Sequence, residues 1–355
     1  MERHSLPAGL AAIASKLAVE SDSPPMRDDD RNCLSASGDP VPLISEIRID
    51  GPLGELAGSL TRIPGSRSGV LIIPGSGPTD RDGNSPLGVK AQTYKLLAEG
   101  LARRHVSSLR IDKRGMFGSR AAVEDPNAVS IDDYVQDVLH WSAVITQRLQ
   151  TPGVWLVGHS EGALVALAAA ANNAGNPLLR GLILIAAPGH PLGAVLKRQI
   201  NSNPANSGIA QSASDIIDQL EAGKRVPLAD VPATLQGLFH PGVQGFLIGL
   251  LAVDPAQLIM AINIPVLILQ GGRDLQVGLA DAQRLKHHQP QATLKIFEHA
   301  NHLMKEVVQE DRAHNIATYS NSALPLTPGL LDTIADFIAT NQDDENPGEM
   351  GKAGW

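Results

Sequence analysis

Short apolar runs alternate with longer stretches of helical periodicity along most of the chain. Bounded by Gly, Pro, Asn or Asp, the apolar runs have the length of buried strands. Parallel strands are predicted at 69–73, 107–111, 154–157, 181–185, 265–269 and 292–297, after an antiparallel pair at 44–49 and 55–62. Helices are predicted at 91–104, 131–149 and 163–173. This alternation predicts an α/β fold with a mostly parallel sheet covered by helices on both faces.

One connection is too long for a simple crossover between strands. Residues 190–262 contain no clear strand, and their short apolar helical stretches are separated by prolines. We therefore predict a helical insertion at 190–262 between two parts of a core, 43–189 and 263–341. The polar ends of the chain, 1–42 and 342–355, are predicted to be a mobile N-terminal segment and a C-terminal tail.

A serine stands at a predicted corner between a strand and a helix. The run VGHSEG at 157–162 places Ser160 in a G-x-S-x-G pattern. Gly158 and Gly162 are needed there, because a side chain would clash where the helix turns back against the strand. The hydroxyl then projects above the sheet, near the positive end of the helix. Ser160 is therefore the predicted nucleophile, and the alternative is a structural serine in a turn.

A nucleophilic serine requires a base and a carboxylate elsewhere in the chain. Asp274 ends a glycine turn directly after the predicted strand 265–269, and His302 follows the predicted strand 292–297. Ser160, Asp274 and His302 thus occur in the order Ser, Asp, His, each just beyond a strand. His299 is the rival base, since it lies nearer to the strand end.

These motifs resemble the α/β-hydrolases, in the bacterial group of serine esterases, acyl hydrolases and aminopeptidase-like enzymes. The resemblance extends from about residue 43 to about residue 341. Segment 72–84 (IIPGSGPTDRDGN) is similar to the oxyanion loop of this group, 110–115 (RIDKRG) resembles the next strand-end motif, and 301–305 (NHLMK) resembles the histidine motif. Many members carry His-Gly where this chain has Pro74 and Gly75.

The resemblance implies an α/β-hydrolase fold, with the insertion 190–262 as a helical cap over the active site. It also implies an oxyanion hole made by the backbone N–H of Glu161 and that of Ser76, with Gly77 as the second choice for the loop donor. The Glu161 carboxylate is an alternative binding group for a substrate amine. Lys305 is predicted to lie on the surface of a helix after His302. No metal and no organic cofactor is implied.

Four further residues are candidates for substrate binding. Asp80 and Arg81 would line the entrance and bind a polar substrate group, or they stabilise their own loop. Phe239 and Phe246 of the predicted cap would line an acyl or alcohol pocket, or they pack the cap onto the core. The expected partner is a small-molecule ester.

Several reactions share this set of groups. Hydrolysis of carboxylic esters is the favoured interpretation, and hydrolysis of an amide, a peptide N-terminus or a thioester is the first alternative. A non-catalytic binding protein with a hydrolase-like fold is the second. A serine nucleophile argues against dehalogenases and epoxide hydrolases, which need a carboxylate at that position.

Composition restricts the partners and the compartment. The 355 residues carry a net charge of −8 and only 3% aromatic residues, which argues against a nucleic-acid or anionic-membrane partner. No window approaches the length of an apolar membrane span. The single cysteine, Cys33, excludes an internal disulfide and predicts a reducing, cytoplasmic location. The oligomeric state is not encoded in any pattern of this sequence.

Overall fold

The computed structural model describes residues 41–343. The predicted segment 1–42, with Cys33, and the predicted tail 342–355 therefore fall almost entirely outside the described residues. None of the helices between residues 41 and 343 is long and apolar enough to cross a membrane.

An eight-stranded sheet forms the centre of the fold, with the strand order β1-β2-β4-β3-β5-β6-β7-β8. The contacts β1–β2 and β2–β4 are antiparallel, and the remaining neighbours are parallel. The strands are β1 Leu43–Asp50, β2 Glu55–Arg62, β3 Gly69–Ile73, β4 Ser107–Ile111, β5 Val154–His159, β6 Leu179–Ile185, β7 Val266–Gly271 and β8 Thr293–Phe297. The prediction of a mostly parallel sheet is confirmed.

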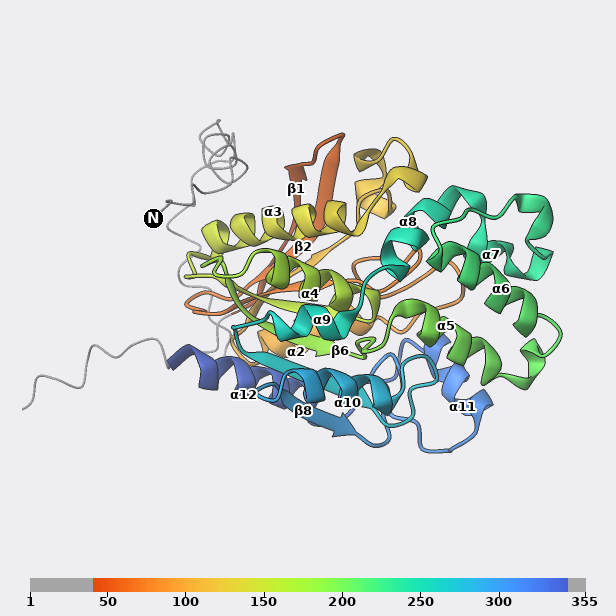
Figure 1. Cartoon of the computed structure of the whole chain (residues 1–355). Helices are drawn as coiled ribbons and strands as arrows, with labels where there is room; N and C mark the ends of the chain where they lie inside the picture. The colour runs from red at the N-terminus through yellow and green to blue at the C-terminus, as the bar shows by residue number, and fades with distance from the viewer. Residues whose placement is uncertain (1–40, 344–355) are drawn as a thin grey trace, which may run out of the picture. The chain divides into compact units, whose positions relative to one another are not determined.

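Helices cover both faces of this sheet (Figure 1). One apolar cluster joins the sheet to α3, α4, α9 and α10, and a second joins it to α2 and α12. These helices are α2 Thr93–Ala102, α3 Ile131–Leu149, α4 Glu161–Asn172, α9 Pro255–Met260, α10 Leu279–His288 and α12 Leu330–Asp343. The short α11, Arg312–Ala317, lies in the connection between β8 and α12.

The predicted insertion is helical and has an apolar cluster of its own. Its helices α5 to α8 gather at one side of the sheet in Figure 1. They are α5 Leu192–Asn201, α6 Ala210–Glu221, α7 Gln236–Phe239 and α8 Pro241–Leu251. Helix α9, at the end of the predicted range 190–262, packs instead on α4 and α10, with Ile259 in the cluster of the sheet.

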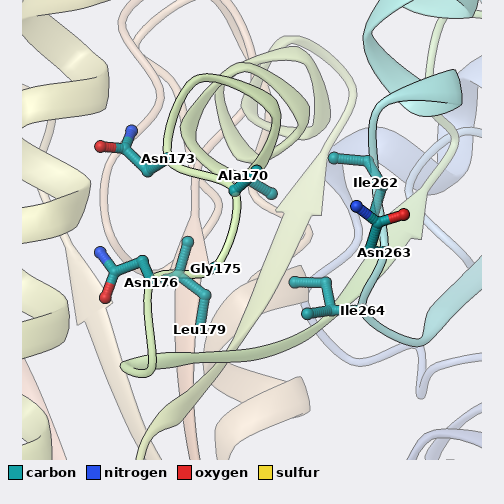
Figure 2. A pocket seen from close by; sticks show the side chains of 9 residues that line it. Ala170, Asn173, Gly175, Asn176, Leu179, Ile262, Asn263 and Ile264 are labelled. Atoms are coloured by element: carbon teal, nitrogen blue, oxygen red, sulfur yellow. The ribbon is translucent and has the colours of Figure 1, made fainter. Parts of the chain in front are cut away.

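A small cavity lies where α4 ends and β6 begins (Figure 2). Its volume is about 20 Å³, which is room for roughly one water molecule. Ligands of such sheets bind beyond the carboxyl ends of the strands, whereas Leu179 in this cavity begins its strand. The cavity is therefore a gap in the packing and is too small and wrongly placed to hold a substrate.

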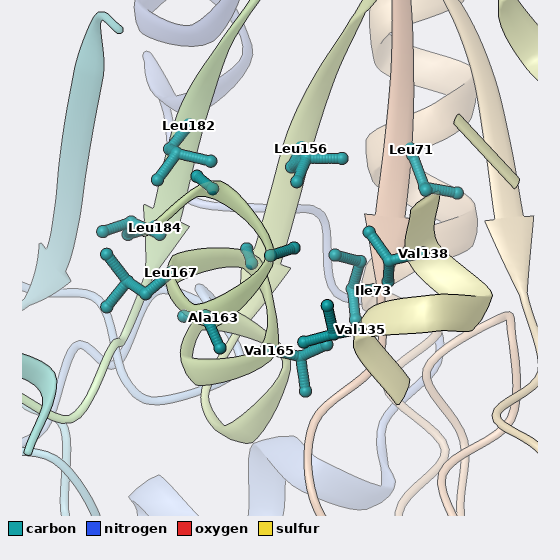
Figure 3. Close-up of a cluster of buried hydrophobic side chains, with 14 of the residues drawn as sticks. Leu71, Ile73, Val135, Val138, Leu156, Ala163, Val165, Leu167, Leu182 and Leu184 are labelled. Carbon is teal, nitrogen blue, oxygen red and sulfur yellow. The ribbon is translucent and has the colours of Figure 1, made fainter. Parts of the chain in front are cut away.

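Helix α4 lies in the centre of the larger apolar cluster (Figure 3). Val165 of α4 lies beside Val135 of α3 and Ile73 of β3, all buried. Ten of the twelve residues of α4 are buried, so the helix has no solvent-facing side over most of its length. This packing fixes the start of α4 firmly above β5, where the predicted nucleophile lies.

Candidate active site

Ser160 lies between β5 and α4 in a backbone conformation that is rare for serine. Its φ is 55° and its ψ is −119°, and its N–H donates to the carbonyl oxygen of Ile185 in β6 at 2.9 Å. A side chain on Gly158 would clash with Gly162 and Ala163, and one on Gly162 would clash with the backbone of β3 and Pro74. The strained turn that the G-x-S-x-G pattern predicts is therefore present, and such strain is concentrated at functional sites.

Asp274 and His302 are joined by a hydrogen bond. The Nδ1–H of His302 donates to Oδ2 of Asp274 at 2.8 Å, and both side chains are buried. Oδ1 of Asp274 accepts the backbone N–H groups of Gln276 at 2.7 Å and Val277 at 2.9 Å. Because the carboxylate is fixed by its own turn, it holds the imidazole with a proton on Nδ1 and leaves Nε2 free to accept one.

The backbone around His302 is held by the side chain of its neighbour Asn301. Asn301 Oδ1 accepts the N–H groups of Leu303 and Lys305 at 3.1 Å, and its Nδ2 donates to Thr318 Oγ1 at 2.7 Å. Asn301 is fully buried. Asn301 therefore holds the turn that carries His302, which explains why an asparagine precedes the histidine in this motif.

His299, the rival base, occupies a different environment. It is exposed and lines an open cleft of about 490 Å³ formed by the segments that follow β7 and β8. Asp274 also borders this cleft, but its buried carboxylate is bound to His302. Only the backbone oxygen of His299 has a partner among the hydrogen bonds of the described residues, the N–H of Val307. The histidine that meets Asp274 is His302.

Tyr94 and His159 connect the oxyanion loop to His302 through a chain of hydrogen bonds. The N–H of Gly75 donates to Tyr94 Oη at 2.9 Å, Tyr94 O–H donates to His159 Nδ1 at 2.8 Å, and His159 Nε2–H donates to the carbonyl oxygen of His302 at 2.8 Å. Burial lowers the pKa of His159 to about 3, so the ring stays neutral and keeps one donor and one acceptor nitrogen. The rings of His159 and His302 are 4.8 Å apart, which places His302 beside the serine turn.

The predicted oxyanion loop runs directly past Ser160. A Cβ atom on Gly75 would lie 3.4 Å from the Cβ of Ser160. The N–H of Gly75 is already bound to Tyr94, whereas Ser76 and Gly77, the two predicted loop donors, are exposed. The N–H of Glu161, the other predicted donor, begins α4.

Asp80 and Arg81 are occupied by structural contacts. Asp80 accepts the N–H groups of Asp82 at 2.9 Å and Asn84 at 2.7 Å within its own loop. Arg81 binds the buried carboxylate of Asp112 through Nε at 3.0 Å and Nη2 at 2.8 Å. These contacts correspond to the loop-stabilising alternative.

Both phenylalanines of the helical insertion pack against other side chains. Phe239 is fully buried in the cluster formed by the cap helices. Phe246 packs edge-on against Tyr134 of α3, with ring centroids 5.5 Å apart, and joins the cap to the core. These contacts correspond to the packing alternative, and a role of either ring in lining a substrate pocket stays a prediction.

The expectation for Lys305 is wrong. No helix follows His302 directly, and Lys305 is fully buried, with Nζ donating to the carbonyl oxygen of Leu324 at 2.6 Å. Burial lowers its pKa to about 8. The segment turns back to pair Glu306 with Ala300, and this turn carries the lysine inward.

Metal binding has no candidate ligand set between residues 41 and 343. No group of three or more His, Cys, Asp and Glu side chains in this part of the chain could hold a metal ion.

The fold and the arrangement around Ser160 define a hydrolase-type α/β protein, and comparison with known proteins agrees. The model of the Alpha/beta hydrolase family matches residues 70–318. The chain therefore belongs to the alpha/beta hydrolase family, as its motifs predict.

Individual relatives are more distant. The chain is similar to Esterase EstD of Thermotoga maritima, with 28% identity over 263 residues. That match covers 73% of this chain and 59% of the relative, so the chain spans less than two thirds of EstD. Among solved structures, the esterase Pf2001 of Pyrococcus furiosus is similar with a TM-score of 0.52, 15% identity and coverage of 84% of this chain and 91% of that one. A thermophilic esterase from Thermogutta terrifontis gives a TM-score of 0.50 at 20% identity, covering 84% and 99%.

Proposed function

We propose that this protein is a serine hydrolase that cleaves carboxylic esters of small molecules through an acyl-enzyme. Ser160 is the nucleophile, His302 the general base, and Asp274 the group that orients the base. The observation that carries the proposal is the buried Asp274–His302 hydrogen bond beside the strained serine turn. That bond leaves Nε2 of His302 available for the serine proton.

The reaction follows the usual course for this set of groups. His302 takes the Ser160 proton as the hydroxyl attacks the ester carbonyl, and the negative oxygen is held by the N–H of Glu161 and that of Ser76 or Gly77. His302 then donates its proton to the departing alcohol. Water hydrolyses the acyl-enzyme with His302 again as the base. Each oxyanion donor contributes about 3 kcal/mol of transition-state stabilisation.

Ester hydrolysis is favoured over the other acyl transfers by the names of the relatives, since EstD and the Pyrococcus and Thermogutta proteins are esterases. Amides, peptide N-termini and thioesters would react through the same groups. The helical cap is the proposed source of preference for one acyl or alcohol part. The single cysteine of the sequence favours the cytoplasm as the location.

The substitution Ser160→Ala tests the proposal. We expect it to abolish hydrolysis of p-nitrophenyl acetate and butyrate without changing the melting temperature by more than a few degrees, because losing one triad member removes most of the catalysis. Ser322→Ala, in an exposed turn, is the matched control and should retain full activity. If Ser160→Ala keeps more than a few per cent of the wild-type kcat, the nucleophile is another group.

A leaving-group panel separates the reaction classes. An esterase hydrolyses p-nitrophenyl esters much faster than the matching anilides, while an amidase or aminopeptidase shows a far smaller difference. A protein that binds these compounds but turns over none of them is a hydrolase-like binding protein.

A further inference from the structure

A buried ion pair lies directly behind the proposed oxyanion hole. Lys113, just after β4, is 5% exposed, and Glu161, the first residue of α4, is 6% exposed. The Lys113 ammonium donates to Glu161 Oε1 at 2.8 Å and to the carbonyl oxygen of Gly75 at 2.7 Å. The ring of Tyr134 completes its surroundings, with its centroid 5.5 Å from Nζ.

Stability alone does not explain this pair. Removing two charges from water is costly, and a buried ion pair can often be replaced by apolar residues of similar size without loss of stability. The groups that Lys113 contacts suggest another role. They are the loop that supplies one proposed oxyanion donor and the residue whose N–H is the other.

The planarity of the peptide bond links Lys113 to the loop donor. The carbonyl of Gly75 and the N–H of Ser76 belong to one trans peptide unit, so they point in opposite directions. A donor that holds the Gly75 oxygen therefore fixes the direction of the Ser76 N–H. The preceding peptide is fixed as well, because the Gly75 N–H is bound to Tyr94. Without the ammonium, rotation of this peptide can bring the Gly75 oxygen toward the negative oxygen of the intermediate.

We propose that Lys113, with Glu161 as its counter-ion, is a positioning residue that orients the oxyanion hole and selects Ser76 as the loop donor. Its ammonium ties the Gly75–Ser76 peptide to the start of α4 and keeps the two donor N–H groups aimed at one point. This inference rests on the proposed function, because it assigns a role within the same acyl-transfer site.

Three variants test the role. Lys113→Met leaves Glu161 buried without its partner, so the double variant Lys113→Met/Glu161→Met, which removes both charges, is the decisive one. We expect it to melt within a few degrees of the wild type while kcat for p-nitrophenyl acetate falls about 100-fold and KM changes less than threefold. Glu161→Gln keeps the Lys113–Gly75 bond and should lose less than tenfold in kcat.

The neighbouring buried pair provides a matched control. Arg114 and Asp137 are joined by hydrogen bonds of 2.7 Å and are buried to a similar degree. Arg114 also binds the part-exposed carboxylate of Asp133 at 2.8 Å, and its hydrogen bonds go to these two residues of α3 and not to the oxyanion loop. Arg114→Met/Asp137→Met removes the same number of charges. Its kcat per folded molecule should stay within threefold of the wild type.

A boronic acid gives a readout that a structural role would not change. Its tetrahedral adduct on Ser160 places an oxygen in the oxyanion hole, so Ki should rise in proportion to the loss in kcat across the variants. The inference is overturned if the folded Lys113→Met/Glu161→Met variant keeps more than a third of the wild-type kcat, or if its defect lies in KM with Ki unchanged. A wild-type protein that hydrolyses no ester and reacts with no fluorophosphonate overturns the proposed function itself, which is a separate result.

Discussion

Replacing Asp274 with asparagine tests the orienting carboxylate with almost no change in shape. Oδ1 of Asp274 accepts two backbone N–H groups, those of Gln276 and Val277. Only an oxygen can satisfy both donors, so D274N keeps its carbonyl oxygen at this position. Its NH₂ group must then take the place of Oδ2 and face His302.

The consequence falls on the tautomer of His302. Oδ2 accepts the Nδ1–H of His302 at 2.8 Å, and an NH₂ group at the same place would set two donors against each other. The ring therefore moves its proton to Nε2, which can then no longer accept the proton of Ser160. In the Ser-His-Asp template, the wrong tautomer lowers kcat about 10⁴-fold, which corresponds to about 5 kcal/mol in the barrier.

The fold should survive this change. Gln270 Nε2, 3.3 Å from Oδ2, also donates to Val277 O at 2.9 Å and Gly271 O at 3.1 Å, so it keeps its partners. The loss is then about one hydrogen bond to a charged group, ~1.5–3 kcal/mol of stability. A large fall in kcat with a modest fall in stability is the expected signature.

The assay is kcat on p-nitrophenyl acetate, with the folded fraction measured by circular dichroism at the same temperature. Asp230→Asn, at an exposed position in the cap, is the control and should match the wild type. A decrease in kcat of less than tenfold in D274N would refute the orienting role of Asp274.

Two further predictions concern the other titratable groups. His302→Ala should lower kcat by several orders of magnitude, whereas His299→Ala, at an exposed position, should change it less than tenfold; the reverse order would make His299 the base. For Lys305, burial lowers the pKa to about 8 in the folded state from its ordinary value of 10.5, so the unfolded chain binds more protons between these pH values. The free energy of unfolding should therefore rise across this window, by up to about 3 kcal/mol relative to Lys305→Met, and parallel pH curves in urea unfolding would contradict this.

Most of the fold follows from local patterns. The strand at 69–73 and the helix at 131–149 have the predicted bounds. The helix bounds are set locally, because Ser130 and Asp133 form a capping box and Gln150 ends the helix in a left-handed conformation. The sharp turn at Ser160 is likewise predicted by its neighbours Gly158 and Gly162.

The side-chain contacts that hold the active-site loops in place could not be predicted from local patterns. Lys113 meets partners 38 and 48 residues away, and Tyr94 meets His159 across 65 residues. A lysine in a strand-end motif and a tyrosine in a helix carry no local sign of these contacts. The burial of Lys305 has no local sign for the same reason, since the carbonyl oxygen that accepts its hydrogen bond belongs to Leu324 in a later segment.

The end of the cap shows another limit of sequence patterns. Helix α9 has the same proline-led, apolar character as the cap helix α8, yet it packs on α4 and α10. Hydrophobic periodicity indicates that a helix has an apolar face, but it does not indicate which other element packs against that face.

Fluorophosphonate labelling of the folded protein, followed by mass mapping of the adduct, is the most direct test of the central claim. Only a serine activated by a base reacts readily with this reagent. We expect a single adduct on Ser160 in the wild type, none in Ser160→Ala, and none after unfolding. An adduct on another residue, or ester hydrolysis that continues without any adduct, would contradict this expectation.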